Sequence, residues 1–189
     1  LPVSNLVVTD NNTWTSDTTP TISFNVTDNI DEVINFTIFV DGTLINATSI
    51  ANDTQVSYVF ESALTEGTRS IVVEAMDEAG NRANSSVLTL HVDSISPVSV
   101  ITSPSAGNTT DSTPTIVFNL TDNIDLNINY SVIVDGSVTN YSSAVNGTAV
   151  SLTLPTQTDG TYSIVVEALD NASNRVNSSV LYLTVDTIA

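Results

Sequence analysis

Two kinds of loop in this 189-residue sequence gather oxygen-bearing side chains in a pattern suited to a metal ion. One loop reads TDNID and occurs at 27–31 and again at 121–125. The other reads DEAGN at 77–81 and DNASN at 170–174. Carboxylate, amide and backbone oxygens are the hard ligands of which Ca²⁺ takes about six to eight. Calcium binding is therefore the first chemistry that these loops suggest.

The segments that precede these loops alternate apolar and polar residues. In TISFNVT at 21–27, for example, Ile22, Phe24 and Val26 point to one side. Such alternation, rich in Val, Ile, Thr and Phe, predicts half-buried strands. The predicted strands of the first half are 3–8, 21–27, 34–40, 43–49, 55–60, 68–76 and 84–92. Seven short strands in about 90 residues predict an immunoglobulin-like β-sandwich, with a lectin-type jelly roll as the alternative, so the fold class is all-β.

The whole pattern occurs twice. TPTISFNVTDNID at 19–31 returns as TPTIVFNLTDNID at 113–125, and IVVEAMDEAGNR at 71–82 returns as IVVEALDNASNR at 164–175. The sequence therefore predicts two tandem sandwiches, residues 1–93 and 98–189, joined by a linker at 94–97. The second copy ends in what resembles the start of a further linker, so we expect the natural chain to continue with more copies on at least one side.

Strand direction predicts which loops share one end of a sandwich. Loops that follow the second and sixth strands lie at the same end, and after seven strands the chain leaves from the opposite end. The linker HVDSISP at 91–97 is therefore expected to meet the loop end of the second domain. The predicted Ca²⁺ ligands are Asp93, Asp122, Asp125 and Asp170, with Asn123 and Asn174 nearby and with Asp28, Asp31, Asp77 and Asp186 as their equivalents at neighbouring joints.

An interpretation without a bound metal ion also fits these loops. Asp and Asn are ordinary turn residues that bond their own backbone, and Arg175 can supply counter-charge. Four further aspartates are interpreted as turn formers, namely Asp17, Asp41, Asp111 and Asp135. His91 is interpreted as a solvated residue on the outward side of its strand, and Trp14 as local packing in the first turn.

Composition excludes several classes of partner. The chain has 21 acidic residues against 3 arginines, no lysine, and a net charge of −18. This charge argues against nucleic acid and against an anionic membrane surface. There is no cysteine, so disulfides and thiolate metal sites are excluded. The sequence contains no apolar stretch of the roughly 20 residues that a membrane span needs, and no signal peptide or lipid anchor is visible.

An unusually large share of the asparagines, 13 of 20, begin an Asn-X-Ser/Thr sequon. Five pairs recur at equivalent positions in the two copies, and Asn25 and Asn35 lie on the outward side of their strands. The pattern predicts a heavily N-glycosylated extracellular chain, although duplication of Thr- and Asn-rich strands also produces sequons. The candidate sites are Asn11, Asn25, Asn35, Asn46, Asn52, Asn84, Asn108, Asn119, Asn129, Asn140, Asn146, Asn171 and Asn177.

The motifs DTTPTI, VDG, EAMDEAGNR and VDSISP, in this order, resemble the tandem bacterial and archaeal Ig-like repeats of large cell-surface adhesins and surface filaments. The resemblance covers both copies almost end to end. It departs in the second copy at DNASN, where Ser173 takes the place of glycine. The resemblance implies tandem rods on cell surfaces, often with Ca²⁺ at the joints, and it implies no particular ligand.

An enzyme is not expected, because a single histidine and only seven glycines leave no recognisable catalytic triad or phosphate-binding loop. The prediction is an extracellular structural module of a glycosylated cell-surface stalk, adhesin or filament, with neighbouring repeats or copies of itself as partners. The alternatives are a carbohydrate- or protein-binding accessory module of a secreted enzyme and an S-layer subunit.

Overall fold

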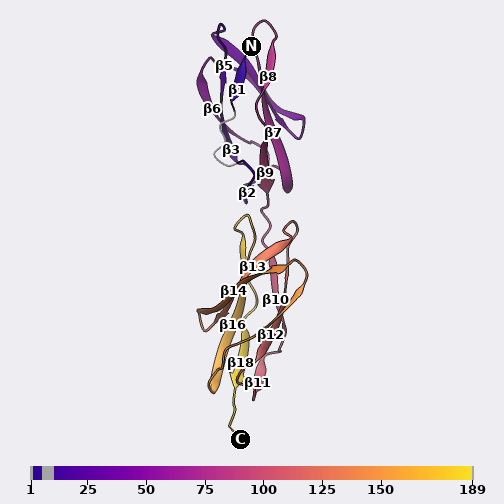
Figure 1. Cartoon of the computed structure of the whole chain (residues 1–189), viewed down its shortest axis with the longest axis vertical. Helices are drawn as coiled ribbons and strands as arrows, with labels where there is room; N and C mark the ends of the chain where they lie inside the picture. The colour runs from indigo at the N-terminus through magenta and orange to yellow at the C-terminus, as the bar shows by residue number, and fades with distance from the viewer. Residues whose placement is uncertain (1, 6–10, 189) are drawn as a thin grey trace. The chain divides into compact units, whose positions relative to one another are not determined.

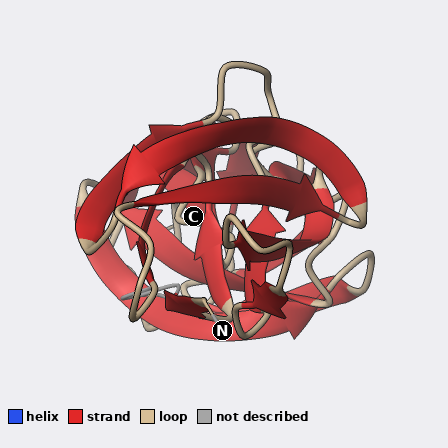
Figure 2. Cartoon of the chain, turned by 90° about the horizontal axis from the view of Figure 1, so that it is seen from above, coloured by secondary structure: helices blue, strands red, loops and turns tan. Residues whose placement is uncertain are grey.

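A computed structural model describes residues 2–5 and 11–188 of the chain. These residues form strands and loops and contain no helix (Figure 2). The chain divides into two compact units, Leu1–Ser94 and Ile95–Ala189, and Figure 1 labels most of their strands. Each unit is an Ig-like β-sandwich, which confirms the predicted fold class.

Unit 1 contains two sheets that face each other across one core. Its strands are β1 (Val3–Asn5), β2 (Thr13–Thr15), β3 (Thr21–Thr27), β4 (Val33–Val40), β5 (Thr43–Ala51), β6 (Thr54–Val59), β7 (Gly67–Met76), β8 (Arg82–Asn84) and β9 (Leu88–Val92). The smaller sheet has the order β1-β3-β6, and the larger has the order β2-β9-β7-β4-β5, with β8 also paired to β7. All pairings are antiparallel except that of β2 with β9.

Unit 2 repeats this topology strand for strand. Its strands are β10 (Val98–Ser103), β11 (Gly107–Thr109), β12 (Thr115–Thr121), β13 (Asn127–Val134), β14 (Ser137–Val145), β15 (Ala149–Thr153), β16 (Gly160–Leu169), β17 (Arg175–Asn177) and β18 (Leu181–Val185). The sheet orders are β10-β12-β15 and β11-β18-β16-β13-β14, with β17 paired to β16. The sequence repeat is thus a repeat of complete sandwiches.

The core follows from the alternation of the strands. In β3 the buried residues are Ile22, Phe24 and Val26, and the polar residues between them are more exposed. The rings of Phe24 and Phe36 meet edge to face across the two sheets, with centroids 4.9 Å apart. Phe118 and Tyr130 do the same in unit 2, at 5.0 Å. Edge-to-face aromatic pairs are favoured by the ring quadrupole, so each unit has its own closed core.

The Asp-Gly hairpins also form as predicted. Asp41 and Gly42, between β4 and β5, have φ values of 50° and 78°, and Asp135 and Gly136 have 46° and 79°. Two successive positive φ values define the type I′ turn that suits a two-residue hairpin. Asp41 does more than turn the chain, because its Oδ1 accepts from the backbone N–H of Ser70 and its Oδ2 pairs with Arg69 Nη1 at 2.7 Å.

Two of the predicted strands differ in the structure. The last predicted strand, 84–92, is interrupted between β8 and β9, where the buried Ser85 leaves the ladder. Of the first predicted strand only β1 is described, since residues 6–8 lie outside the described residues. The unpredicted strand β2 crosses to the other sheet and pairs with β9.

Candidate functional site

The acidic loops of each unit meet at one end of the sandwich. In unit 2 they are the β12–β13 loop with Asp122 and Asp125, and the β16–β17 loop with Asp170. Asp125 Oδ2 accepts from the backbone N–H of Asn171 at 2.7 Å, and Asp125 Oδ1 accepts from the Asn171 side-chain amide at 2.8 Å. These bonds join the two loops, so the structure places Asp122, Asp125 and Asp170 in one cluster within unit 2.

Asp122 and Asp125 shape their own loop. Asp122 Oδ1 accepts from the backbone N–H groups of Ile124 and Asp125, both at 2.9 Å. This is the local bonding by which aspartate forms turns. Asp125 is buried and held on both carboxylate oxygens by Asn171, so both aspartates have a structural role in addition to the predicted metal-binding one.

Asp170 is a buried acid whose pKa is shifted by its surroundings. Its side chain is buried, and Asn174 donates to both carboxylate oxygens at 2.7 Å, through its backbone N–H and its side-chain amide. Burial raises the pKa of the Asp170 carboxyl above its usual value, and the neighbouring charges of Asp122 and Asp125 raise it further, against the lowering effect of Asn174. Three acids close together are therefore mutually unfavourable, and this is the electrostatic condition in which a cation is attracted.

Unit 1 repeats the cluster with Asp28, Asp31 and Asp77. Asp31 Oδ2 accepts from the backbone N–H of Glu78 at 2.9 Å, which joins the two loops as in unit 2. The backbone N–H of Ile30 holds the pKa of the Asp28 carboxyl below its usual value. Asn81 holds the buried Asp77 by its backbone N–H and its side-chain amide.

The remaining predicted ligands lie at the opposite end of each unit. Asp93 follows β9 and Asp186 follows β18, and their backbone N–H groups donate to the carbonyls of Thr15 and Thr109, both at 2.9 Å. Within a unit they are therefore separated by the length of the sandwich from the loop cluster. The predicted ligand set, which combines Asp93 of unit 1 with three aspartates of unit 2, stays a prediction.

The arginine expected to supply counter-charge is engaged elsewhere. Arg175 Nη1 pairs with Glu167 Oε1 at 2.9 Å across β17 and β16, and Arg82 pairs with Glu74 in the same way in unit 1. The predicted turn formers Asp17 and Asp111 are confirmed, since each accepts at 2.8 Å from the backbone N–H two residues later.

His91 and Trp14 differ from the sequence interpretation. Trp14 lies in β2 and not in a turn, and its ring stacks on that of His91 with centroids 4.8 Å apart. His91 also makes hydrogen bonds to Thr68 Oγ1 at 2.9 Å and to Asn12 Oδ1 at 3.1 Å. His91 lies on the outward side of β9 and is partly exposed, as interpreted, but it is not an isolated side chain, because the parallel pairing of β2 with β9 brings Trp14 over its ring.

The sequon asparagines are distributed over the surface of both units. Six are exposed, namely Asn11, Asn35, Asn84, Asn108, Asn171 and Asn177. Seven are half-buried, namely Asn25, Asn46, Asn52, Asn119, Asn129, Asn140 and Asn146. Burial alone therefore does not separate glycan acceptors from structural asparagines, and the hydrogen bonds of each side chain matter.

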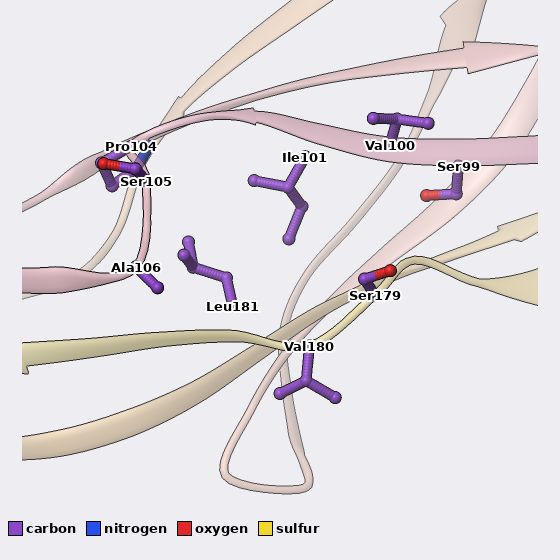
Figure 3. A pocket seen from close by; sticks show the side chains of 9 residues that line it. All are labelled: Ser99, Val100, Ile101, Pro104, Ser105, Ala106, Ser179, Val180 and Leu181. Carbon is purple, nitrogen blue, oxygen red and sulfur yellow. The ribbon is translucent and has the colours of Figure 1, made fainter.

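A groove in unit 2, between β10 and β18, has a volume of about 300 Å³ (Figure 3). The side chains of Ile101 and Leu181 point toward one another inside it, while Val100 and Val180 point away. Its other lining residues are Ser99, Pro104, Ser105, Ala106 and Ser179, so it holds no titratable group. The groove therefore offers no side chain that could act as an acid or a base.

Several solved structures resemble this chain at low sequence identity. The fibronectin(III)-like modules of Clostridium thermocellum CbhA share 16% identity with a TM-score of 0.50, over 97% of this chain and 94% of that one. The BSP domain of a biofilm-associated protein shares 16% identity with a TM-score of 0.36, over 95% of this chain and 30% of that one. SGBP-B of the Bacteroides ovatus mixed-linkage glucan utilization locus was solved with a mixed-linkage heptasaccharide. It shares 15% identity with a TM-score of 0.35, over 97% of this chain and 47% of that one.

The sequence comparisons identify the family. No curated protein shows significant similarity to the chain. In the part that the structure describes, no helix has the length and apolar character to cross a membrane. The sequence pattern of the bacterial Ig-like domain matches residues 5–94 and again 102–187. The chain therefore belongs to the bacterial Ig-like domain family, and it contains two tandem copies of that domain.

Proposed function

We propose that this chain is an extracellular structural module, a pair of spacer or assembly units from a heavily N-glycosylated cell-surface stalk, adhesin or filament. The observation that carries the proposal is the path of the chain through each unit. In unit 2, β10 begins beside the end of β12, where Val98 pairs with Thr121 at the loop cluster, and β18 ends at the opposite end, where Val185 pairs with Gly160. A unit that takes the chain from one end to the other suits serial repetition.

The surface chemistry supports this role. A net charge of −18 favours solubility and discourages non-specific association between chains. Edge strands β5 and β14 carry no charged residue and no proline, and each has a sequon near its middle, at Asn46 and Asn140. Unprotected edges invite pairing with other strands, and glycans at these positions would block such pairing.

Calcium is the cofactor that we propose for the acidic loops. The proposal is supported by the cluster of Asp122, Asp125 and Asp170 within unit 2 and by the raised pKa of the Asp170 carboxyl. Burial is the main cause of this raised pKa, and a divalent cation would relieve the repulsion from Asp122 and Asp125 that adds to it. Asp93 of the preceding unit is the fourth proposed ligand, on the strength of the sequence alone.

The experiment that tests the function combines location with mass. Antibodies raised against this chain should label intact cells of the source organism, and mild protease treatment of those cells should release the antigen. Native material should exceed the 19.9 kDa mass of the peptide by several glycans for each copy of this segment. Labelling only after permeabilisation, together with a mass equal to that of the peptide, would contradict the proposal.

A further inference from the structure

Two of the predicted glycosylation sites, Asn52 and Asn146, are tied into the backbone of a neighbouring loop. Asn146 lies in the turn between β14 and β15. Its Nδ2 donates to the carbonyl oxygens of Asp122 and Asp125, both at 2.7 Å, and its Oδ1 accepts from the N–H of Asp122 at 3.2 Å. Every polar atom of this side chain is thus bonded to the β12–β13 loop.

Unit 1 contains the same arrangement. Asn52 Nδ2 donates to the carbonyl oxygens of Asp28 at 2.7 Å and Asp31 at 2.8 Å, and Asn52 Oδ1 accepts from the N–H of Asp28 at 3.0 Å. The two copies differ in the residue that follows, Asp53 in unit 1 and Gly147 in unit 2. The retention of all three bonds despite this difference indicates that they belong to the fold and not to one turn sequence.

The chemistry of N-glycosylation conflicts with these bonds. A side-chain amide has two N–H hydrogens, and attachment of a glycan replaces one of them with a bond to a sugar carbon. Asn52 and Asn146 use both hydrogens for backbone carbonyls. A glycan would remove one hydrogen bond and place a sugar ring against a loop carbonyl that now lacks its donor, at the usual cost of an unmade bond.

The other sequons do not have this conflict. Asn171 donates one N–H to Asp125 and Asn25 donates one to Asp53, which leaves a second hydrogen on each amide. The side-chain amides of the exposed Asn35, Asn84 and Asn177 do not donate both hydrogens to the backbone of a neighbouring loop. Among the described residues, the double donation by a sequon amide occurs at Asn52 and Asn146.

We infer that Asn52 and Asn146 are structural residues that stay unmodified in the folded protein, and that the glycans required by the proposed function are confined to the other sequons. The inference depends on the proposed function in one respect, namely that other sequons of the chain carry glycans. Because both asparagines hold the loops that carry Asp28, Asp31, Asp122 and Asp125, they also fix the positions of the predicted calcium ligands.

Site-resolved mass spectrometry of folded, glycosylated protein tests the inference. Chymotrypsin and a Glu-specific protease are suited to the digestion, since the chain has three arginines and no lysine. Peptides with Asn52 and Asn146 should carry no glycan, while several of the exposed sequons should be occupied. A glycan on either residue in folded protein would overturn the inference and leave the proposed function intact. If every sequon is empty, the glycoprotein proposal fails, and the structural role is decided by the variants below.

Matched variants of unglycosylated protein measure the structural role directly. Asn146→Ala and Thr148→Ala both destroy the sequon, but only the first removes the loop bonds, because Thr148 is exposed. Asn146→Ala should lower the melting temperature of unit 2 by at least about 4 °C, and Thr148→Ala should leave it unchanged. Asn146→Asp loses both donors and adds a charge beside Asp122 and Asp125, so it should lower the melting temperature at least as far as Asn146→Ala. If Asn146→Ala does not fold, Asn52→Ala measures the same bonds in unit 1. Equal melting temperatures for all three and the parent would overturn the inference.

Discussion

At the scale of single residues, the two copies differ at a position with a left-handed backbone. Ser173 has a φ of 72°, and Gly80 has a φ of 84° at the equivalent place in unit 1. A side chain at Gly80 would contact nothing within 4 Å, so the cost of a larger residue there comes from the backbone alone. An L-residue in this conformation is strained by about 1–2 kcal/mol, part of which is offset by the greater freedom of an unfolded glycine.

We predict that Ser173→Gly stabilises unit 2 by about 0.5–1 kcal/mol. The reverse change in unit 1, Gly80→Ser, should destabilise that unit by a similar amount and is the matched control. Denaturant unfolding of unglycosylated protein is the measurement, because Ser173 also belongs to the sequon of Asn171. A loss of stability in Ser173→Gly would show that the serine makes a contribution that outweighs its backbone strain.

Two aspartates should titrate on opposite sides of the ordinary aspartate pKa of 3.8. The N–H of Ser70, together with Arg69, lowers the pKa of the Asp41 carboxyl, so its stabilising effect is present above pH 3.8 and is lost as the pH falls through its lower folded value. Burial raises the pKa of the Asp170 carboxyl, so its charge costs stability at neutral pH, and this cost disappears as the pH falls through its folded value above 3.8.

Carboxyl-carbon NMR titration measures both midpoints. Asn174→Ala is the informative variant, because it removes the side-chain donor that favours the charged form of Asp170. In that variant the pKa of the Asp170 carboxyl should rise further, while the pKa of the Asp41 carboxyl stays where it is. An Asp170 midpoint at or below 3.8 would show that the loop is hydrated well enough to remove the effect of burial.

At the scale of elements, a buried serine in each unit interrupts the last strand and completes the ladder with its side chain. Between β17 and β18, Ser178 Oγ accepts from the backbone N–H of Val166 at 3.0 Å, and the N–H of Ser178 donates to the Val166 carbonyl at 2.9 Å. Ser85 does the same with Val73 in unit 1. The hydroxyl thus takes the place of a carbonyl that the bulged backbone no longer offers.

We predict that Ser178→Ala destabilises unit 2 by about 1–3 kcal/mol, because it leaves the buried N–H of Val166 without an acceptor. Ser179→Ala, a change at the exposed neighbour, is the control and should stay within about 0.5 kcal/mol of the parent. Thermal unfolding of unglycosylated protein compares the two variants. If Ser178→Ala matches its control, water reaches the Val166 N–H and the bulge does not depend on the hydroxyl.

The strands that sequence predicted well are those with a local signal. Alternation over seven or eight residues identified β3 and β4, and Asp-Gly identified the turn after β4. The pairing of β2 with β9 had no such signal, because three residues are too few to show alternation and each residue pairs with one 77 positions further along the chain, as Trp14 does with His91. The stacking of Trp14 on His91 depends on that pairing and was missed for the same reason.

The candidate site was predicted in part by the same reasoning. Strand direction brings the loops after the second and sixth strands together, as the bonds between Asp125 and Asn171 show within unit 2. The turn after the fourth strand lies at that end too, so the direction argument also applied to Asn146. It was interpreted only as a glycan acceptor, because the sequon gives no indication that the amide is already used.

At the scale of the whole molecule, the dominant property is its acidity. With 21 acidic residues and 3 arginines, most carboxylates have no basic partner in the chain. All three arginines are paired in the structure, with Asp41, Glu74 and Glu167. Unneutralised charge of one sign lowers the stability of the compact state, so the chain should respond to cations more strongly than a protein of balanced charge.

A specific calcium site differs from this general response in its dependence on particular carboxylates. We predict that Ca²⁺ stabilises the folded chain by about 2.7 kcal/mol when its free concentration exceeds Kd a hundredfold, and that Asp122→Asn/Asp125→Asn removes this gain. Asp28→Asn/Asp31→Asn is the matched control, because it removes the same two charges from the equivalent loop of unit 1, where Asp93 is not among the proposed ligands.

Calorimetry with calcium, with magnesium and with chelator distinguishes the two responses at constant ionic strength. For a specific site, the melting temperature of the parent and of the unit 1 variant should rise with calcium, and that of the unit 2 variant should not. Equal rises in all three proteins, or equal rises with magnesium, would mean that the cations act on the overall charge. In that case the bonds from Asn146, Asn171 and Asn174 are sufficient to hold the aspartates of unit 2 in place without a metal.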